Sequence, residues 1–196
     1  MKRSAPATQR NREPIAAVLR EVLPERGTLV EIAAGTGEHA VHFARLFPTL
    51  EWRPTDPDPA ALASIQAWRS ESGLANLLEP LRLDAAADPW PVDQANAILC
   101  VNMVHISPWA ATEGLMKGAG HLLAGGGPLV LYGPYRRAGT TTAPSNEAFD
   151  ESLKARDPEW GLRDLEAVEA ESAKNGLELE RVVEMPANNL TLVFSR

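Results

Sequence analysis

The fold can be read outward from one short segment, Thr28-Leu29-Val30-Glu31-Ile32-Ala33-Ala34-Gly35-Thr36-Gly37-Glu38-His39. Its first part, residues 28–34, is an apolar run that suits a buried strand, and apolar residues recur at helical spacing after the two glycines. Glycine allows positive φ and has no Cβ to keep a ligand away, while the free N–H groups of a helix start point outward. The segment therefore predicts a strand, a tight turn and a helix, with room for a nucleotide-like ligand at the turn.

The composition is that of an ordinary globular protein. Of the 196 residues 44% are hydrophobic and 23% are charged, so we expect a single α/β domain over residues 1–196, with residues 1–9 mobile. Lys and Arg number 19 against 26 Asp and Glu, a net charge of −7. With no long basic run, we expect no nucleic-acid partner. No apolar stretch approaches the length of a membrane span and no signal-like opening is present, so we expect no membrane partner and a cytoplasmic location.

Strand-like and helix-like segments alternate along most of the chain. Apolar runs predict strands at residues 28–34, 50–55, 77–83, 95–101 and 129–132. A helix is expected before the first strand, at 14–23 with Asn11 as its cap, and others between the strands; this alternation is typical of a parallel sheet with crossover helices. The last two runs, 177–185 and 190–195, are joined by too few residues for a crossover helix, so they must be antiparallel neighbours. Cys100, the only cysteine, lies in an apolar run and is expected to be a buried structural thiol.

The glycine turn suits two classes of cofactor. Residues 35–40 match the dinucleotide pattern G-x-G-x-x-A, and Asp56 lies where an acid that binds ribose hydroxyls is expected. A carboxylate in that position serves NAD and S-adenosylmethionine equally well. Glu31 would repel a pyrophosphate but suits a cationic ligand, and the sequence has no Tyr-x-x-x-Lys pair. These features favour S-adenosylmethionine, with an NAD-dependent oxidoreductase as the weaker alternative.

Six short motifs are spread over nearly the whole chain: Glu31-Ile-Ala-Ala-Gly-Thr-Gly-Glu-His39, Asn102-Met-Val-His-Ile-Ser-Pro-Trp109, Tyr132-Gly-Pro-Tyr135, Ala143-Pro-Ser-Asn146, Arg156-Asp-Pro-Glu-Trp160 and Met185-Pro-Ala-Asn-Asn189. Together they resemble an uncharacterised, mainly bacterial family of class I S-adenosylmethionine-dependent methyltransferases related to animal methyltransferase-like protein 26. The resemblance implies a Rossmann-like fold: a mostly parallel seven-stranded sheet with a C-terminal antiparallel strand pair and helices on both faces. It also implies S-adenosylmethionine as cofactor and S-adenosylhomocysteine as product.

The class I pattern further implies a cofactor site at the carboxyl ends of the strands. The residues implied around the methionine end of the cofactor are Glu31, Ala33, Gly35, Gly37, Asn102 and Met103. Asp56 would hold the ribose hydroxyls, and Asp84 would meet the adenine amino group. His39, on the first turn after the glycines, is expected to neighbour the cofactor. Ala33 and Ala34 replace a more common glycine, which narrows the approach to the turn.

Methyl transfer is an in-line displacement at a sulfonium, so the protein must hold the nucleophile against the methyl group in a dry pocket. His105, shortly after the fourth strand, is the candidate base; its alternative role is a hydrogen bond within the fold. Tyr135 is a second catalytic candidate, because its hydroxyl could orient the nucleophile. The candidate substrate-contacting residues are Asn11, Trp109, Tyr132, Asn146 and Asn189.

The remaining features bear on the class of function. The polar segment 136–146 has the length of a lid. Trp160 is expected only to pack, and His39 and His42 lack further ligands around them, so no metal site is predicted. Because no basic face or recognition appendage is evident, we predict methyl transfer to a small-molecule acceptor. A non-catalytic module that binds S-adenosylmethionine or a partner is the alternative. No sequence pattern specifies an oligomeric state.

Overall fold

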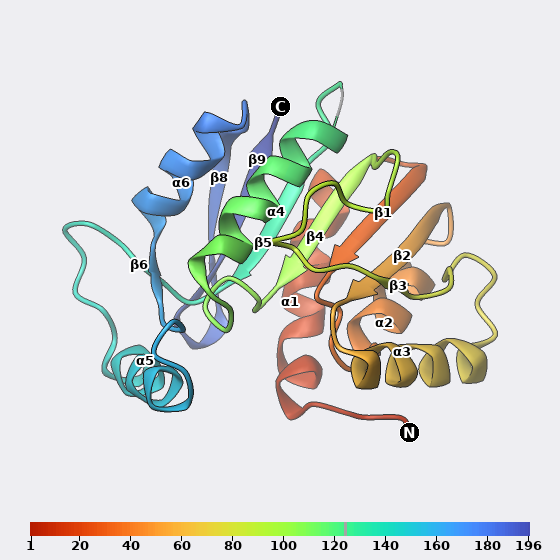
Figure 1. The fold of residues 1–196 in the computed structure, drawn as a ribbon, viewed down its shortest axis with the longest axis horizontal. Helices are drawn as coiled ribbons and strands as arrows, with labels where there is room; N and C mark the ends of the chain where they lie inside the picture. The colour runs from red at the N-terminus through yellow and green to blue at the C-terminus, as the bar shows by residue number, and fades with distance from the viewer. Residues whose placement is uncertain (124) are drawn as a thin grey trace.

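A seven-stranded sheet forms the centre of the computed structural model, which describes residues 1–123 and 125–196 (Figure 1). The strand order is β3-β2-β1-β4-β5-β9-β8. The strands of this sheet are β1 Gly27–Ile32, β2 Leu50–Asp56, β3 Leu81–Arg82, β4 Ala97–Val101, β5 Leu129–Gly133, β8 Glu178–Met185 and β9 Asn189–Ser195. Neighbouring strands from β3 to β5 are parallel, and β9 runs antiparallel to both β5 and β8. The predicted fold class, including the antiparallel C-terminal pair, is confirmed.

Helices cover both faces of the sheet. Their bounds are α1 Pro6–Val22, α2 Glu38–Leu46, α3 Pro59–Ser72, α4 Trp109–Leu122, α5 Pro144–Arg156 and α6 Leu165–Lys174, with a short 3-10 turn at Pro186–Asn188. Alternate strand residues face opposite sides, so the core has two layers. Leu29 and Leu99 pack with α1 and α2, whereas Val30 and Cys100 pack with α4 and α6. Helix α5 lies beyond the carboxyl ends of the strands (Figure 1). No helix in the described ranges is both long and apolar enough to cross a membrane.

The first helix begins earlier than predicted. It starts at Pro6, so Asn11 lies inside it rather than capping it, and residues 6–9 of the segment expected to be mobile are helical. Proline is favourable at a first helical position, because the N–H it lacks would have no partner there. The residues before it also make contacts: the Arg3 amide donates to Ser64 Oγ across 2.8 Å. Apolar periodicity begins only at Ile15, which is why the sequence pattern did not reveal this first part.

Two further segments differ from the sequence prediction. The third strand spans only Leu81–Arg82 instead of 77–83, and Leu77 forms an isolated bridge to Trp52. Pro80, which has no N–H to donate to a strand ladder, separates the two parts. The segment predicted as a loop at 136–146 is shorter, because α5 begins at Pro144. A small parallel sheet, β6 Tyr135–Arg136 with β7 Arg163–Asp164, was not predicted.

Candidate active site

The glycine turn joins the end of β1 to the start of α2. Gly35 and Gly37 have φ angles of 58° and 89°, in the left-handed region that favours glycine. A Cβ on Gly37 would lie 2.8 Å from the Ile65 Cα of α3, whereas a Cβ on Gly35 would meet nothing closer than the Ala33 carbonyl at 4.0 Å. Gly37 is therefore required for packing, and Gly35 faces open space.

Asp56, the last residue of β2, fixes this turn. Its Oδ2 accepts a hydrogen bond of 2.9 Å from the Gly35 amide, and its Oδ1 accepts one of 3.0 Å from the Asp58 amide. Burial raises the pKa of Asp56, and these two backbone hydrogen bonds lower it in part. Since each carboxylate oxygen has two lone pairs, both oxygens can accept further hydrogen bonds from a ligand at the turn.

A cavity of about 440 Å³ opens at the carboxyl ends of the strands, beside the glycine turn. Five predicted cofactor residues line it: Ala33, Gly35, Asp56, Asp84 and Met103. Further lining residues were not predicted as site residues; they include Pro57, Leu83, Ala85, Ile106, Ser107, Pro108 and Trp160. Three of them, Pro57, Leu83 and Ala85, directly flank Asp56 or Asp84 in the sequence, and this adjacency is a signal that could have found them. Trp160 comes from a distant segment, so the interpretation that it only packs was incomplete.

Glu31 does not line this cavity. It is 1% exposed, and its Oε2 accepts a hydrogen bond of 2.6 Å from the Trp52 indole N–H. Burial raises the pKa of Glu31 to about 8, although the Trp52 hydrogen bond acts in the opposite direction. At neutral pH the carboxyl is therefore mostly protonated in the ligand-free protein. Gly37, His39 and Asn102 also lie outside the residues that line the cavity.

Asn11 joins two other predicted residues on the α1 and α2 side of the sheet. Its Oδ1 lies 2.8 Å from His39 Nε2, and its side chain acts on the Tyr132 hydroxyl, whose pKa burial raises and Asn11 lowers in part. Burial lowers the pKa of His39 to about 4, with smaller contributions from His42 and Arg12. A neutral His39 with its proton on Nε2 is the form that can donate to Asn11 Oδ1. The three side chains therefore connect α1, α2 and the end of β5.

His105 is buried in the segment that follows β4, with 3% of its surface exposed. Its Nδ1 lies 3.0 Å from the position that a Cβ on Gly133 would occupy, and the Phe149 ring packs edge-on against the imidazole at 5.6 Å between centroids. Among the described residues Nδ1 has no hydrogen-bond partner. Burial, followed by the charge of Arg163, lowers the pKa of His105 to about 4. His105 is therefore neutral near pH 7.

Neither His105 nor Tyr135 is among the residues that line the cavity, although Ile106, the residue after His105, does line it. The Tyr135 ring packs in the core layer that α4 and α6 cover, and the Tyr135 hydroxyl has no hydrogen-bond partner in the ranges 1–123 and 125–196. Burial raises the pKa of this hydroxyl above its usual value. Tyr135 also lines a separate hollow of about 120 Å³ together with Asn146.

The other predicted substrate residues hold local structure. Asn146 Nδ2 donates to the Asn188 carbonyl across 2.9 Å. Asn189 Nδ2 donates to the carbonyl of Pro186 across 3.0 Å, and the Trp109 ring lies 5.8 Å from the Arg163 guanidinium. None of these three lines the 440 Å³ cavity. Substrate contact by these residues stays a prediction.

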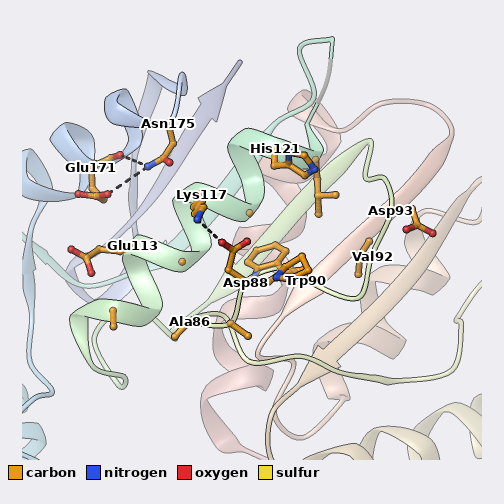
Figure 2. A pocket seen from close by; sticks show the side chains of 16 residues that line it. Ala86, Asp88, Trp90, Val92, Asp93, Glu113, Lys117, His121, Glu171 and Asn175 are labelled. Atoms are coloured by element: carbon orange, nitrogen blue, oxygen red, sulfur yellow. Dashed lines mark hydrogen bonds and ion pairs between the residues drawn. The ribbon is translucent and has the colours of Figure 1, made fainter.

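A larger hollow of about 860 Å³ lies between α4, the segment 86–93 and the start of α6's last turn (Figure 2). The ion pair of Lys117 with Asp88 crosses it, and Trp90 packs against α4 at Gly118. It contains no predicted site residue but shares Ala86 and Ala110 with the cofactor cavity. Over the part of the chain that the structure describes, no cluster of three His, Cys, Asp or Glu side chains could hold a metal ion.

Solved structures share this arrangement of strands and helices. An O-methyltransferase family protein from Burkholderia thailandensis is similar with a TM-score of 0.80 and 16% identity, over 97% of this chain and 57% of that one. The mitomycin 7-O-methyltransferase MmcR is similar with a TM-score of 0.80 and 20% identity, over 97% of this chain and 54% of that one. CalO1, a methyltransferase in calicheamicin biosynthesis, is described in its S-adenosylhomocysteine-bound form. It is similar with a TM-score of 0.72 and 16% identity, over 93% of this chain and 54% of that one.

This chain therefore spans about half the length of these three proteins, and at such low identities the likeness establishes the class I methyltransferase fold. A family model gives the closer assignment. It carries the description "Protein of unknown function (DUF938)" and matches residues 2–196. Since this match takes in nearly the whole sequence, the protein belongs to the DUF938 family.

Proposed function

We propose that the protein transfers a methyl group from S-adenosylmethionine to a small-molecule acceptor. The observation that carries this proposal is the meeting of the open glycine turn, Asp56 and Asp84 in one cavity. The fold is that of methyltransferases, one of which is described with S-adenosylhomocysteine bound. The relation to animal methyltransferase-like protein 26, the cytoplasmic location and the absence of a nucleic-acid partner stay predictions from the sequence.

The residues that line the cavity suit this cofactor chemically. Gly35 leaves open space above the turn, and the Asp56 oxygens retain lone pairs for two ribose hydroxyls. Asp84 would accept from the adenine amino group, and Met103 would border the methionine moiety. When bound, S-adenosylmethionine supplies a methyl group on a positively charged sulfur, which is a good leaving group. The protein's task is then to hold and desolvate the reacting atoms.

His105 is the residue that we propose as the base. A neutral, buried imidazole whose Nδ1 has no partner among the described residues can take the proton of an acceptor O–H or N–H as the new bond to carbon forms. Phe149, which is 39% exposed and packs on His105, would exclude water from the acceptor side. The geometry favours His105 over Tyr135 for this role, because Ile106 next to His105 lines the cofactor cavity, whereas Tyr135 lines a separate hollow.

Parallel calorimetric titrations with S-adenosylmethionine, S-adenosylhomocysteine and NAD test the cofactor. We expect micromolar binding of the first two and none of NAD, whereas binding of NAD alone would overturn the proposal in favour of an oxidoreductase. Fractionated small-metabolite extracts then test the transfer through formation of S-adenosylhomocysteine. His105→Gln should bind the cofactor but form no product. Cofactor binding without product formation in any fraction would support the non-catalytic alternative.

A further inference from the structure

We propose that Asp150 is a positioning residue, which holds His105 and the Trp160 wall of the cavity in place. The consequence for methyl transfer rests on the proposed function, but the positioning itself does not. Asp150 does not line the cavity, and its side-chain hydrogen bonds go to Arg136, Lys154 and Leu162, so it would act on His105 through the segments it connects. Four sets of contacts connect the Asp150 carboxylate to the site.

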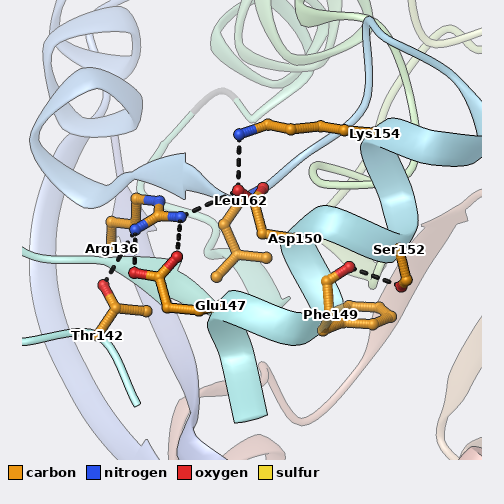
Figure 3. A network of polar contacts seen from close by, with 8 residues as sticks. All are labelled: Arg136, Thr142, Glu147, Phe149, Asp150, Ser152, Lys154 and Leu162. Atoms are coloured by element: carbon orange, nitrogen blue, oxygen red, sulfur yellow. Dashed lines mark hydrogen bonds and ion pairs between the residues drawn. The ribbon is translucent and has the colours of Figure 1, made fainter. Parts of the chain in front are cut away.

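The first set is a network of ion pairs that joins α5 to β6 (Figure 3). Arg136 of β6 contacts both oxygens of Glu147 at 2.6 Å and Asp150 Oδ2 at 3.0 Å. Lys154, one turn further along α5, contacts the same Asp150 oxygen at 2.6 Å. One carboxylate oxygen therefore receives two cationic donors, one from its own helix and one from β6.

The second set of contacts involves the other oxygen of the Asp150 carboxylate. Asp150 Oδ1 accepts a hydrogen bond of 2.7 Å from the Leu162 amide. The preceding residue, Gly161, has a φ of 148°, and a Cβ there would lie 2.8 Å from Asp150 Oδ1. Only glycine thus allows the carboxylate to approach this backbone so closely. Asp150 binds α5, β6 and the segment before β7 to one another.

The third set of contacts joins residues 161–163 to the backbone around His105. The Gly161 amide donates to the His105 carbonyl across 3.0 Å. Arg163, two residues later, donates from Nε to the Val104 carbonyl across 3.2 Å and from Nη2 to the Ser107 carbonyl across 2.8 Å. Residues 161–163 therefore hold the backbone on both sides of His105.

In the fourth set, the residues that precede Asp150 and Gly161 in the sequence contact the site directly. Phe149 precedes Asp150 on α5, and its ring packs on the His105 imidazole. Trp160 precedes Gly161 and lines the cofactor cavity. A shift of Asp150 would consequently move one wall of the cavity and the residue that we propose as the base.

Glu147 shares Arg136 with Asp150 and provides the matched comparison. The Asp150 side chain is 4% exposed and that of Glu147 is 45% exposed. Burial alone would raise the pKa of Asp150, but the hydrogen bonds from Lys154, Leu162 and Arg136 lower it overall. A buried carboxylate with several donors fixes geometry far more than an exposed one does. We therefore expect the two acids to differ sharply when each is neutralised.

The experiment compares Asp150→Asn with Glu147→Gln in the full chain by NMR. We expect the Gly161 amide of Asp150→Asn to exchange with solvent about tenfold faster or more, because a charged hydrogen bond that anchors its segment is lost. The ring signals of His105, assigned with His105→Gln, should move as well. Glu147→Gln should leave both readouts as in the wild type. Exchange of the Leu131 amide in the central sheet should be equal in both variants.

Equal Gly161 exchange in the two variants, or a rise matched by Leu131, would overturn the positioning role. If Asp150→Asn does not fold, Lys154→Met gives the same test: it removes one donor to the carboxylate and should accelerate Gly161 exchange to a lesser degree. Titration with S-adenosylmethionine separates this proposal from the first. A wild type that fails to bind it refutes the proposed function and leaves the exchange result valid. Where the wild type binds, Asp150→Asn should bind several-fold more weakly than Glu147→Gln.

Discussion

The Trp52 indole N–H donates to the Glu31 carboxyl across 2.6 Å, between two adjacent parallel strands and with both residues almost fully buried. This contact satisfies one oxygen of an acid that has almost no access to water. It does not offset the cost of burying a charge, so burial holds the pKa of Glu31 near 8. The protein therefore keeps a mostly neutral carboxyl next to its glycine turn at neutral pH.

Glu31→Gln should remove a pH dependence of stability. The pKa of Glu31 is about 8 in the folded protein and 4.5 as an unperturbed group, so the folded chain binds one more proton between these values. Wild-type stability should then fall with rising pH across this window, by at most about 1.4 kcal/mol per pH unit. Urea unfolding at pH 5, 6, 7 and 8 measures the slope. Glu51→Gln, an exposed change on the neighbouring strand, is the control, and parallel slopes for wild type and Glu31→Gln would contradict the prediction.

His39 and His105 should act in the opposite direction on the acid side. Burial lowers the pKa of each from 6.5 to about 4, so the unfolded chain binds more protons between these values. The contribution of the two neutral histidines to the stability of the folded state is complete above pH 6.5 and is lost as the pH falls towards 4. Replacing either by Gln should reduce the loss of stability between pH 6 and 4.5, as measured by urea unfolding. His121→Gln, on the exposed side of α4, should not change it, and an equal effect of all three changes would refute the assignment.

Asp56→Ala should weaken binding of S-adenosylmethionine by about 1–3 kcal/mol, because charged acceptors for the ribose hydroxyls are lost. The change also frees the Gly35 amide, so calorimetry should be accompanied by a measurement of unfolding. Asp58→Ser is the matched control, since serine can still cap α3, where Asp58 accepts from the Ala60 amide. An affinity of Asp56→Ala equal to that of this control would refute the ribose assignment.

Gly114→Ala tests how the Ala85 and Ala86 side of the cavity is supported. A Cβ at this position in α4 would lie 2.1 Å from the Ala85 carbonyl and 2.8 Å from the Ala86 Cα, and both alanines line the cavity. Overpacking should cost about 1–3 kcal/mol of stability, more than alanine gains in a helix. We also expect weaker binding of S-adenosylhomocysteine, measured by calorimetry. Glu113→Ala, an exposed change beside it, should affect neither property.

The sheet was predictable because its strands carry strong apolar runs that alternate with helical spacing. The antiparallel pair followed from the short connection at 186–189 alone. Elements whose ends depend on proline were less accurate: Pro6 begins α1 before any periodicity is visible, and Pro80 divides the third strand.

The candidate site was predictable where it is local to a strand end. Ala33, Gly35, Asp56, Asp84 and Met103 line the cavity, because parallel strands bring their carboxyl ends to one edge. Trp160 could not be placed, since it reaches the cavity through tertiary packing of the segment before β7. Tyr132 and Tyr135 are three residues apart, and side chains at an odd spacing in extended chain face opposite sides. Their separation into different core layers could have been foreseen from that spacing.

Cys100 lies in β4 between two parallel neighbours and is buried in the layer that α4 and α6 cover. Burial raises the pKa of its thiol to about 12, so the reactive thiolate is scarce and inaccessible while the sheet is closed. Because it is the only cysteine in the sequence, its rate of alkylation reports the opening of the central strands without any introduced label. A ligand that binds the closed sheet should slow this alkylation in proportion to its occupancy, so a native side chain can serve as the probe for ligand screening.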